Sequence, residues 1–305
     1  MEKIFFNSLN NYFKKTFGEK IYKLSIDAGF TCPNRDGKIS EKGCIFCSEN
    51  GSGDFTGNKF DSITKQIISQ KKFISSKFNG NKYVAYFQNF TNTYANVRHL
   101  RKIYYEALSN DDIIGIAIAT RPDCLDENVL NLLDEINKKH FMWIELGLQT
   151  SNDKVANWLN RGYPTKTYID ITKKLQKRNI KFVTHIIVGL PFEEKDDYLK
   201  TAILSNKCGT WGIKIHLLYL VKGTIIAEYY EKEKFELESK ESYVKKVVDI
   251  LEHISPDIVV HRLTGDGNKN ELLAPMWSTN KKDVLNSIIK EFKIRSSYQG
   301  KFFKA

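Results

Sequence analysis

Over most of the first 220 residues, short apolar segments alternate with longer segments in which apolar residues recur every three or four positions. Runs such as IIGIAIAT and FVTHIIVGL are typical of strands covered on both faces, and the periodic segments are typical of amphipathic helices. The predicted strands are Lys20–Ile26, Lys82–Gln88, Ile113–Thr120, Met142–Leu148, Lys181–Val188 and Ile213–Tyr219. The predicted helices are Asp61–Phe78, Val97–Leu108, Glu127–Lys138, Asn152–Leu159, Thr165–Arg178 and Glu194–Lys207.

Strands that alternate with helices pair in parallel, because each helix returns the chain to the same end of the sheet. Six such strands are fewer than the eight that close a full barrel. The pattern therefore predicts a partial, open (β/α)₆ TIM-like barrel, with a doubly wound sheet as the alternative. Both arrangements place functional residues at the C-terminal ends of the strands.

The segments on either side of this core follow a different pattern. Residues 1–19 predict an amphipathic helix that packs its aromatic face on the barrel, and residues 20–222 form the predicted core. From residue 223 to 305 we expect a C-terminal α/β extension, with a strand at Asp257–Arg262, packed against the open side of the barrel.

Composition and charge narrow the class of protein. The chain has 305 residues, 41% hydrophobic residues and a net charge of +11. No apolar run approaches the length of a membrane span and no targeting segment is evident, so the sequence predicts a cytoplasmic protein with no membrane partner. The charge is compatible with a polyanionic partner, but only 8 of the 47 basic residues are Arg, and a generally lysine-rich surface would give the same total.

Three of the five cysteines lie within 16 residues, in the spacing C-x₁₁-C-x₂-C at Cys32, Cys44 and Cys47. In a reducing compartment this pattern indicates a metal site rather than disulfides, whereas Cys124 and Cys208 are interpreted as small buried hydrophobic residues. Three thiolates would hold a [4Fe–4S] cluster and leave one iron without a protein ligand. The alternative is a structural zinc site completed by Cys124 or a histidine.

The motifs TCPN…GCIFC, IAIATRPDCL, IELGLQTSND, LNRGY and THIIVGLPFE give the segment from about Lys20 to Tyr219 a specific resemblance. It resembles the radical S-adenosylmethionine (SAM) superfamily, in the branch around the Elongator catalytic subunit and oxygen-independent coproporphyrinogen oxidase. The whole chain is similar to a small bacterial member without an acetyltransferase domain. The resemblance implies a [4Fe–4S] cluster on the three cysteines, SAM on the open iron, and an electron donor such as flavodoxin or ferredoxin. One electron would cleave SAM to a 5′-deoxyadenosyl radical.

The resemblance also implies where SAM binds. Phe46 would shield the adenine, the backbone at Leu190 would pass near it, and Arg161 would pair with the SAM carboxylate. Two residues that flank the fourth strand would face the ribose and methionine: Glu145 and Gln149. The superfamily's GGE stretch is replaced by QNFTNT at residues 88–93, so the amides and hydroxyls of this loop are expected to contact the SAM amino group instead, at Gln88, Asn89 and Thr91.

The catalytic residue is not identified by sequence, but four polar candidates face the predicted barrel or lie in the extension: His185, His216, His261 and Asp266. Arg121 and Asp123 are expected to form an ion pair. A wobble-uridine side chain in tRNA is the substrate that the Elongator resemblance and the charge favour. A small metabolite is the alternative, and a zinc-stabilised nucleic-acid-binding module is an alternative of another class.

Overall fold

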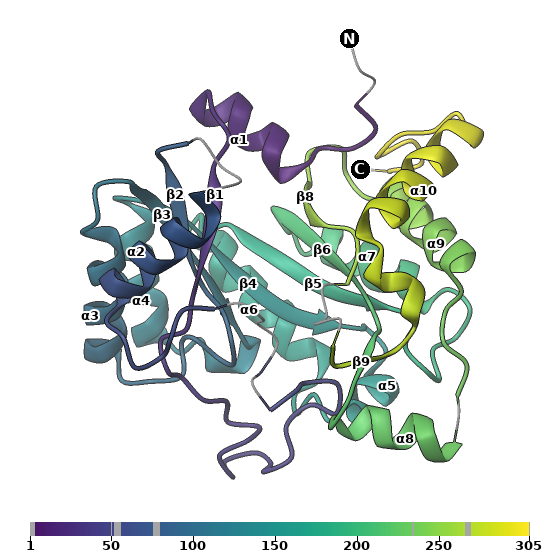
Figure 1. The fold of residues 1–305 in the computed structure, drawn as a ribbon, viewed down its shortest axis with the longest axis horizontal. Coiled ribbons are helices and arrows are strands. Elements are labelled where there is room, and N and C mark those ends of the chain that lie inside the picture. Colours follow the sequence, from purple (N-terminus) through teal and green to yellow (C-terminus); the bar gives the residue numbers. More distant parts are fainter. Residues whose placement is uncertain are drawn as a thin grey trace.

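The computed structural model describes residues 4–49, 51, 56–75, 80–233, 235–265 and 270–304. Its centre is a seven-stranded sheet in the order β1-β2-β3-β4-β5-β6-β8, in which every neighbouring pair is parallel. The strands are β1 (Tyr22–Ile26), β2 (Tyr83–Phe87), β3 (Ile113–Thr120), β4 (Phe141–Gln149), β5 (Phe182–Val188), β6 (Gly212–Leu217) and β8 (Val259–Arg262). The spatial order of the strands follows their order in the chain, without the reversal that a doubly wound sheet requires, so the doubly wound alternative is wrong. The sheet curves into an open half-barrel (Figure 1).

The seventh strand is the main difference from the predicted topology. We expected the extension to pack against the open side of a six-stranded barrel. Instead β8 pairs with β6 and continues the sheet, with Gly212 opposite Val259 and Lys214 opposite Arg262. The extension therefore supplies part of the barrel wall itself.

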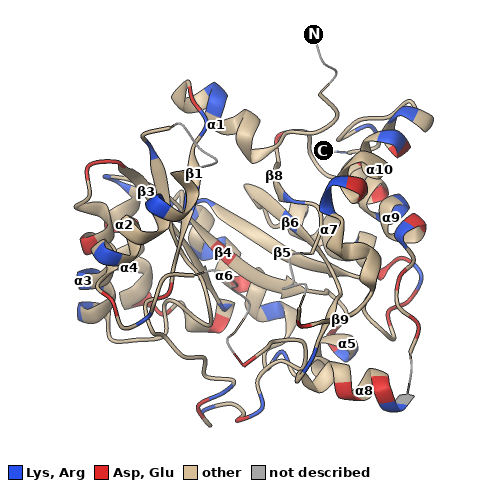
Figure 2. Cartoon of the chain, viewed as in Figure 1, with Lys and Arg blue, Asp and Glu red and all other residues tan. Residues whose placement is uncertain are grey.

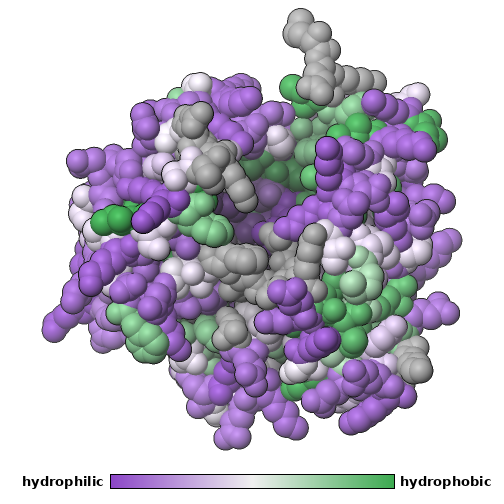
Figure 3. Space-filling model, in the orientation of Figure 1, coloured by the Kyte–Doolittle hydropathy of each residue, from purple (hydrophilic) through white to green (hydrophobic). Residues whose placement is uncertain are grey.

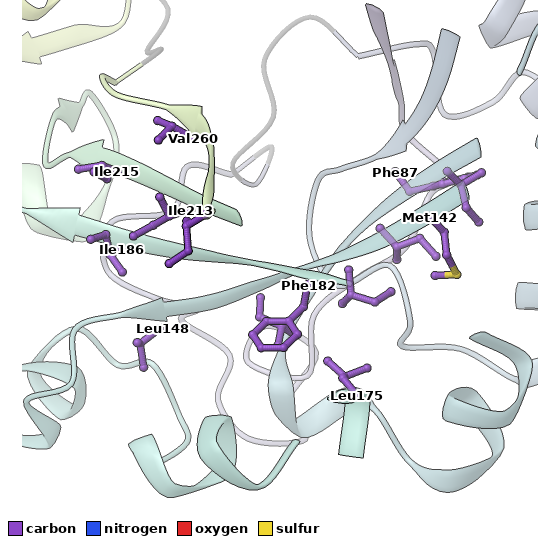
Figure 4. Close-up of a cluster of buried hydrophobic side chains, with 14 of the residues drawn as sticks. Phe87, Met142, Leu148, Leu175, Phe182, Ile186, Ile213, Ile215 and Val260 are labelled. Carbon is purple, nitrogen blue, oxygen red and sulfur yellow. The ribbon is translucent and has the colours of Figure 1, made fainter. Parts of the chain in front are cut away.

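Amphipathic helices cover the outer face of the sheet. They are α2 (Ile63–Ile74), α3 (Val97–Leu108), α4 (Glu127–Asn137), α6 (Thr165–Lys177), α7 (Asp197–Lys207), α9 (Lys240–His253) and α10 (Lys281–Ile294). Polar caps start several of them, as where the Asp126 carboxylate accepts from the Val129 amide at 2.9 Å. Between helices and sheet lies one apolar core, whose residues in Figure 4 include Phe87, Met142, Leu148, Leu175, Phe182, Ile186, Ile213, Ile215 and Val260. This packing fixes the position of every strand end.

The helix α1 (Leu9–Phe17) packs on the inner face of the sheet, near the N-terminal ends of the strands (Figure 1). Phe13 is 1% exposed, and its ring centroid lies 6.4 Å from that of Trp143. Phe17 contacts Phe141 at 5.2 Å, and Tyr12 contacts Trp211 at 5.0 Å. These rings form an aromatic layer inside the half-barrel.

Shorter elements follow the C-terminal ends of the strands. They are a 3₁₀ turn at Pro122–Cys124, α5 (Asp153–Trp158), β7 (Leu220–Val221), α8 (Ile225–Glu233), β9 (Leu272–Ala274) and a second 3₁₀ turn at Met276–Thr279. In the described part of the chain, no helix is both long and apolar enough to cross a membrane.

Candidate active site

The predicted metal-binding cysteines lie in the loop between β1 and α2, at the C-terminal edge of the sheet. Cys44 and Cys47 belong to a tight turn in which the Cys47 amide donates to the Cys44 carbonyl at 3.0 Å. The Arg35 guanidinium donates to the carbonyls of Cys47 (3.1 Å) and Ser48 (2.7 Å). Gly43 has a φ of 71°, and a Cβ there would lie 2.8 Å from the Arg35 Nε. Glycine is therefore needed where the loop passes Arg35.

The cysteine loop is also tied to the segment that follows α5. The Asn34 side chain donates to the Asn160 carbonyl at 2.6 Å, and the Asn160 side chain donates to the Gly43 carbonyl at 2.6 Å. The Ile45 amide donates to the Leu159 carbonyl at 3.0 Å. This exchange of hydrogen bonds joins segments about 120 residues apart and holds the loop over the strand ends.

All three thiols line one cavity of about 210 Å³. A hydrogen bond from Cys47 lowers the pKa of Cys44 to about 7, and the charges of Arg121 and Arg35 and the Asn34 amide, 3.6 Å from its sulfur, act in the same direction. The same hydrogen bond, together with burial, raises the pKa of Cys47. The pair is therefore set to carry a thiolate, which is the form that binds iron.

The other two cysteines do not share this cavity. Cys124 lies beside Asp123, 3.8 Å from its Oδ1, and burial raises its pKa to about 12. Cys208 is buried in the outer core. Among the described residues, no group of three or more His, Cys, Asp and Glu side chains is placed to hold a single metal ion. Three thiols around one cavity, without a fourth cysteine in its lining, fit a tetranuclear cluster with one open iron.

The loop at residues 88–93, which follows β2, includes two residues in the left-handed conformation that glycine favours. Asn89 has a φ of 69° and Phe90 a φ of 54°, both left-handed. The Asn89 side chain donates to Asp27 at 2.8 Å and to Thr56 at 3.2 Å. Asn92 donates back to the Asn89 carbonyl at 2.9 Å. Side-chain hydrogen bonds thus stabilise this left-handed backbone path.

A buried polar cluster lies deeper in the cavity, on four strands. The Glu145 carboxylate is 1% exposed and accepts from Tyr86 (2.6 Å), Trp143 (3.0 Å) and His185 (2.8 Å). It also forms an ion pair with Lys214, which is 2% exposed. Burial opposes ionisation, but the charges of Lys214 and Lys23 hold the pKa of Glu145 well below its usual value.

Two histidines complete this cluster. Burial lowers the pKa of His185 to about 4, and the charge of Lys214 adds to the effect. His216 lies next to it, with ring centroids 5.1 Å apart, and burial also lowers its pKa. Both rings are therefore neutral near pH 7 and line the cavity. The polar floor is the name used below for five residues: Tyr86, Glu145, His185, Lys214 and His216.

Arg161, which the resemblance implied as a partner of the SAM carboxylate, is surrounded by protein groups. It is 1% exposed and absent from the cavity lining. Its five N–H groups donate to the carbonyls of Leu148, Thr150 and Tyr163, the Asp153 carboxylate and the Thr165 hydroxyl. All five N–H groups thus have partners within the chain, and Arg161 orders the segment after β4. The guanidinium in the cavity wall is that of Arg121, which forms the expected bidentate pair with Asp123 at 2.8 and 2.9 Å.

The other predicted residues divide between the cavity and its surroundings. The cavity lining includes Phe46, Gln88, Thr91, Glu145, Gln149, His185 and His216. Asn89 supports the adjoining loop, and Leu190 packs in an apolar cluster with Ile45 and Leu218. His261 lies in the aromatic layer, 5.5 Å from Trp143 and 5.1 Å from Trp211. Asp266 lies outside the described residues.

Lys214 and Tyr86 were missed by the sequence analysis. The available signal was strand alternation: in GIKIHL, Lys214 is two residues before His216 and must face the same side of the sheet. A lysine on the inner face of an otherwise apolar strand needs a partner or a ligand.

A half-barrel with three cysteines around one cavity, at the C-terminal edge of its sheet, is the arrangement expected of an enzyme that binds an iron–sulfur cluster with an open iron. Residues 32–204 match the Radical SAM superfamily, and residues 210–293 match the Radical_SAM C-terminal domain. The chain belongs to the radical SAM superfamily, and its cofactors are a [4Fe–4S] cluster and SAM. The zinc-module alternative is wrong.

The relatives that match most of the chain include two bacterial proteins. The protein YtqA of Bacillus subtilis is 46% identical over 299 residues, which cover 98% of this chain and 93% of YtqA. The protein YhcC of Escherichia coli is 36% identical over 268 residues, which cover 88% of this chain and 85% of YhcC. An N-terminally deleted Elp3 of Methanocaldococcus infernus has a similar fold, with a TM-score of 0.68 and 12% identity over 92% of this chain and 64% of Elp3.

The residues of this chain have defined tasks in that chemistry. When bound, the cluster, SAM and a reductant supply a 5′-deoxyadenosyl radical. Cys32, Cys44 and Cys47 would ligate the cluster, and Arg35 holds the backbone of their turn. The aromatic layer fills the half-barrel near the N-terminal ends of the strands, which limits the access of water from that side.

Proposed function

We propose that this radical SAM enzyme modifies a side chain on the wobble uridine of tRNA, with flavodoxin or ferredoxin as the electron donor. The observation that carries the proposal is the combination of the cysteine-lined cavity with the motifs similar to the Elongator branch. A net charge of +11 suits a polyanionic substrate. The side chain to be modified would be one already placed on the uridine, such as a carboxymethylaminomethyl-type group.

The loops near the cavity provide groups that suit RNA. The cysteine loop carries exposed Lys38 and Lys42, and Lys59 is exposed before α2. Two rings stand out from loops that follow strands: Phe60 is 86% exposed and Phe192 is 64% exposed. Lysines near the opening of a cavity can contact the phosphates of RNA, and exposed aromatic rings can stack on its unpaired bases. Lys and Arg also lie along α1 and α10 on other parts of the surface, as Figure 2 shows, so these loops are the part of the surface to test.

The enzymatic part of the proposal is tested with purified protein. Anaerobically reconstituted protein should bind iron and sulfide and release 5′-deoxyadenosine from SAM in the presence of dithionite. Cys44→Ala should abolish both properties, because the cluster loses a ligand. Cys208→Ala, a cysteine in the outer core, is the matched control and should keep them.

The tRNA part is tested separately. Removal of the gene should change one defined tRNA nucleoside, and the precursor should accumulate. Binding of the purified protein to tRNA should weaken linearly with log salt, and Lys38→Gln with Lys42→Gln should reduce that slope by about one per lysine. An unchanged nucleoside profile, with intact SAM cleavage, would instead favour a small metabolite as substrate.

A further inference from the structure

Two neighbouring helices on the outside of the half-barrel, α2 and α3, carry basic side chains on the sides that face solvent (Figure 2). On α2, Lys65 and Lys72 are exposed and lie on one side of the helix, about 10 Å apart along its axis. On α3, Arg98 and Lys102 are exposed and lie one turn apart on the same side. The outer basic face is the name used below for these four residues. The surface view shows hydrophilic residues over much of the visible side of the molecule (Figure 3).

The outer basic face has few carboxylates near it. Its four cations form no ion pair with the described residues. Lys71 and Arg101, on the same two helices, are instead paired with carboxylates. The segment that forms α2 contains no acidic residue, and α3 contains one, Glu106, whose carboxylate accepts from the Thr64 amide at 3.1 Å. The solvent-facing sides of these helices therefore have an excess of positive charge, which attracts a polyanion.

Both helices begin at the edge of the sheet that carries the cysteine loop. Lys59 and Phe60 come shortly before α2. The Lys38 ammonium of the cysteine loop lies 5.3 Å from the centroid of the Tyr94 ring, shortly before α3, and Thr91 of the same segment lines the cavity. An RNA that passes over these loops would therefore reach the outer basic face next.

Building on the proposed function, we propose that the outer basic face binds phosphates in a helical stem of the substrate tRNA while the wobble nucleotide lies at the cavity. A tRNA carries a phosphate at every nucleotide, so groups for these cations are present far from the reacting base. Contacts of Lys and Arg with phosphates fix the position of a nucleic acid without reading its sequence. The face would thus position the substrate and raise its affinity, and would take no part in the radical chemistry.

An acidic electron-donor protein is the other partner that this charge could attract. Phe87 of β2 packs on Tyr104 of α3, with ring centroids 5.3 Å apart, whereas the next residue along the strand, Tyr86 of the polar floor, lines the cavity from the other face of the sheet. The sheet and a helix about 10 Å in diameter therefore separate the outer basic face from the cavity. An electron donor must approach the cluster, so this separation favours RNA.

Two pairs of substitutions test the face, with labelled tRNA from a strain without the gene and fluorescence anisotropy over a salt series of about 50 to 200 mM. Lys65→Gln with Lys72→Gln, and Arg98→Gln with Lys102→Gln, should each weaken binding about tenfold or more. Each pair should also lower the slope of log affinity against log salt by about two, one for each cation removed. A short RNA duplex without a loop should show the same losses, because the face binds a stem.

Lys290→Gln with Lys293→Gln is the matched control, because it removes the same charge from exposed positions on α10. It should leave the affinity and the slope as in the wild type. All variants should keep the wild-type circular dichroism and cleave SAM at the wild-type rate with dithionite. Losses in the two pairs no larger than in the control would overturn the proposal. Normal tRNA binding with slower SAM cleavage by reduced flavodoxin would also overturn it, since the face would then bind the electron donor.

The binding result is independent of the nucleoside assay. If the two pairs lose affinity for tRNA and for the duplex, but the strain without the gene has unchanged tRNA nucleosides, the wobble-uridine function fails and the outer basic face stands as an RNA-binding surface. If one nucleoside changes but the two pairs bind tRNA as the control does, the proposed function stands and the outer basic face is not its tRNA contact.

Discussion

Glu145→Gln is the most informative single substitution for the stability of the site. The change keeps the shape of the side chain but removes the negative charge that pairs with Lys214, a residue 2% exposed. Breaking a buried ion pair costs about 3–5 kcal/mol, because the remaining charge is left without a partner. Two unit charges ~4 Å apart at an effective dielectric constant of ~20 give an interaction of about 4 kcal/mol, which agrees in size.

The measurement is urea unfolding of the wild type and the variant under anaerobic conditions. A loss of about 4 kcal/mol, at a slope near 3 kcal/mol/M, would move the midpoint by roughly 1 M. Glu127→Gln is a matched control: Glu127 also contacts two cations, Lys174 at 2.9 Å and Arg178 at 2.7 Å, but its side chain is 59% exposed. For this exposed pair we expect a loss below about 1 kcal/mol.

A second variant separates loss of the pair from loss of shape. Lys214→Met alone should also destabilise the protein, because Glu145 then loses its closest cation. The double variant should lose less than the sum of the two single losses, by about 2 kcal/mol or more. Two results would contradict this reasoning. One is a loss of unfolding free energy in Glu145→Gln no larger than that in Glu127→Gln. The other is a double variant whose loss equals the sum of the losses in Glu145→Gln and Lys214→Met, because the buried pair then contributes no stability of its own.

Three further predictions concern other parts of the molecule. Phe13→Ala should lower the free energy of unfolding by about 3–5 kcal/mol, measured in urea, because it empties the centre of the aromatic layer. Arg161→Lys should lower the thermal midpoint but leave the SAM dissociation constant of the folded protein unchanged, since all five guanidinium N–H groups bind the protein. Burial raises the pKa of Glu193 to about 7. Because the folded state then binds the proton more tightly than the unfolded state, the free energy of unfolding falls as pH rises from about 4.5 to 7. Glu193→Gln should remove this dependence and be more stable than the wild type at pH 8, by up to about 3 kcal/mol, in unfolding curves recorded at pH 5 and 8.

The fold could be predicted from local patterns because each strand is an apolar run between amphipathic helices. The third strand was predicted as Ile113–Thr120 and has those bounds in the structure, and the second differs by one residue at each end. The pairing of β8 with β6 was not predicted, because a four-residue strand has little pattern of its own. Its place depends on contacts with the rest of the fold.

The site was predicted only in part, for a similar reason. The spacing of Cys32, Cys44 and Cys47 predicted a metal site, because residues close together in the sequence are also close together in the fold. The role of Arg161 depends on carbonyls that are exposed only after β4 ends, and the partner of Glu145 is 69 residues away. Hydrogen bonds and ion pairs between different strands cannot be predicted from the sequence pattern of a single segment.

The far edge of the sheet has a consequence for behaviour in concentrated solution. The segment before α1 runs alongside β8: the Val260 amide donates to the Asn7 carbonyl at 2.7 Å, and Ser8 forms a parallel bridge with Val260. Gln299 donates its backbone amide to Phe5 and adds a second connection to the same segment. A strand edge covered in this way offers fewer free amides to a neighbouring molecule. Loss of this short segment would therefore favour sheet-to-sheet association and aggregation, even though it lies far from the cysteine loop.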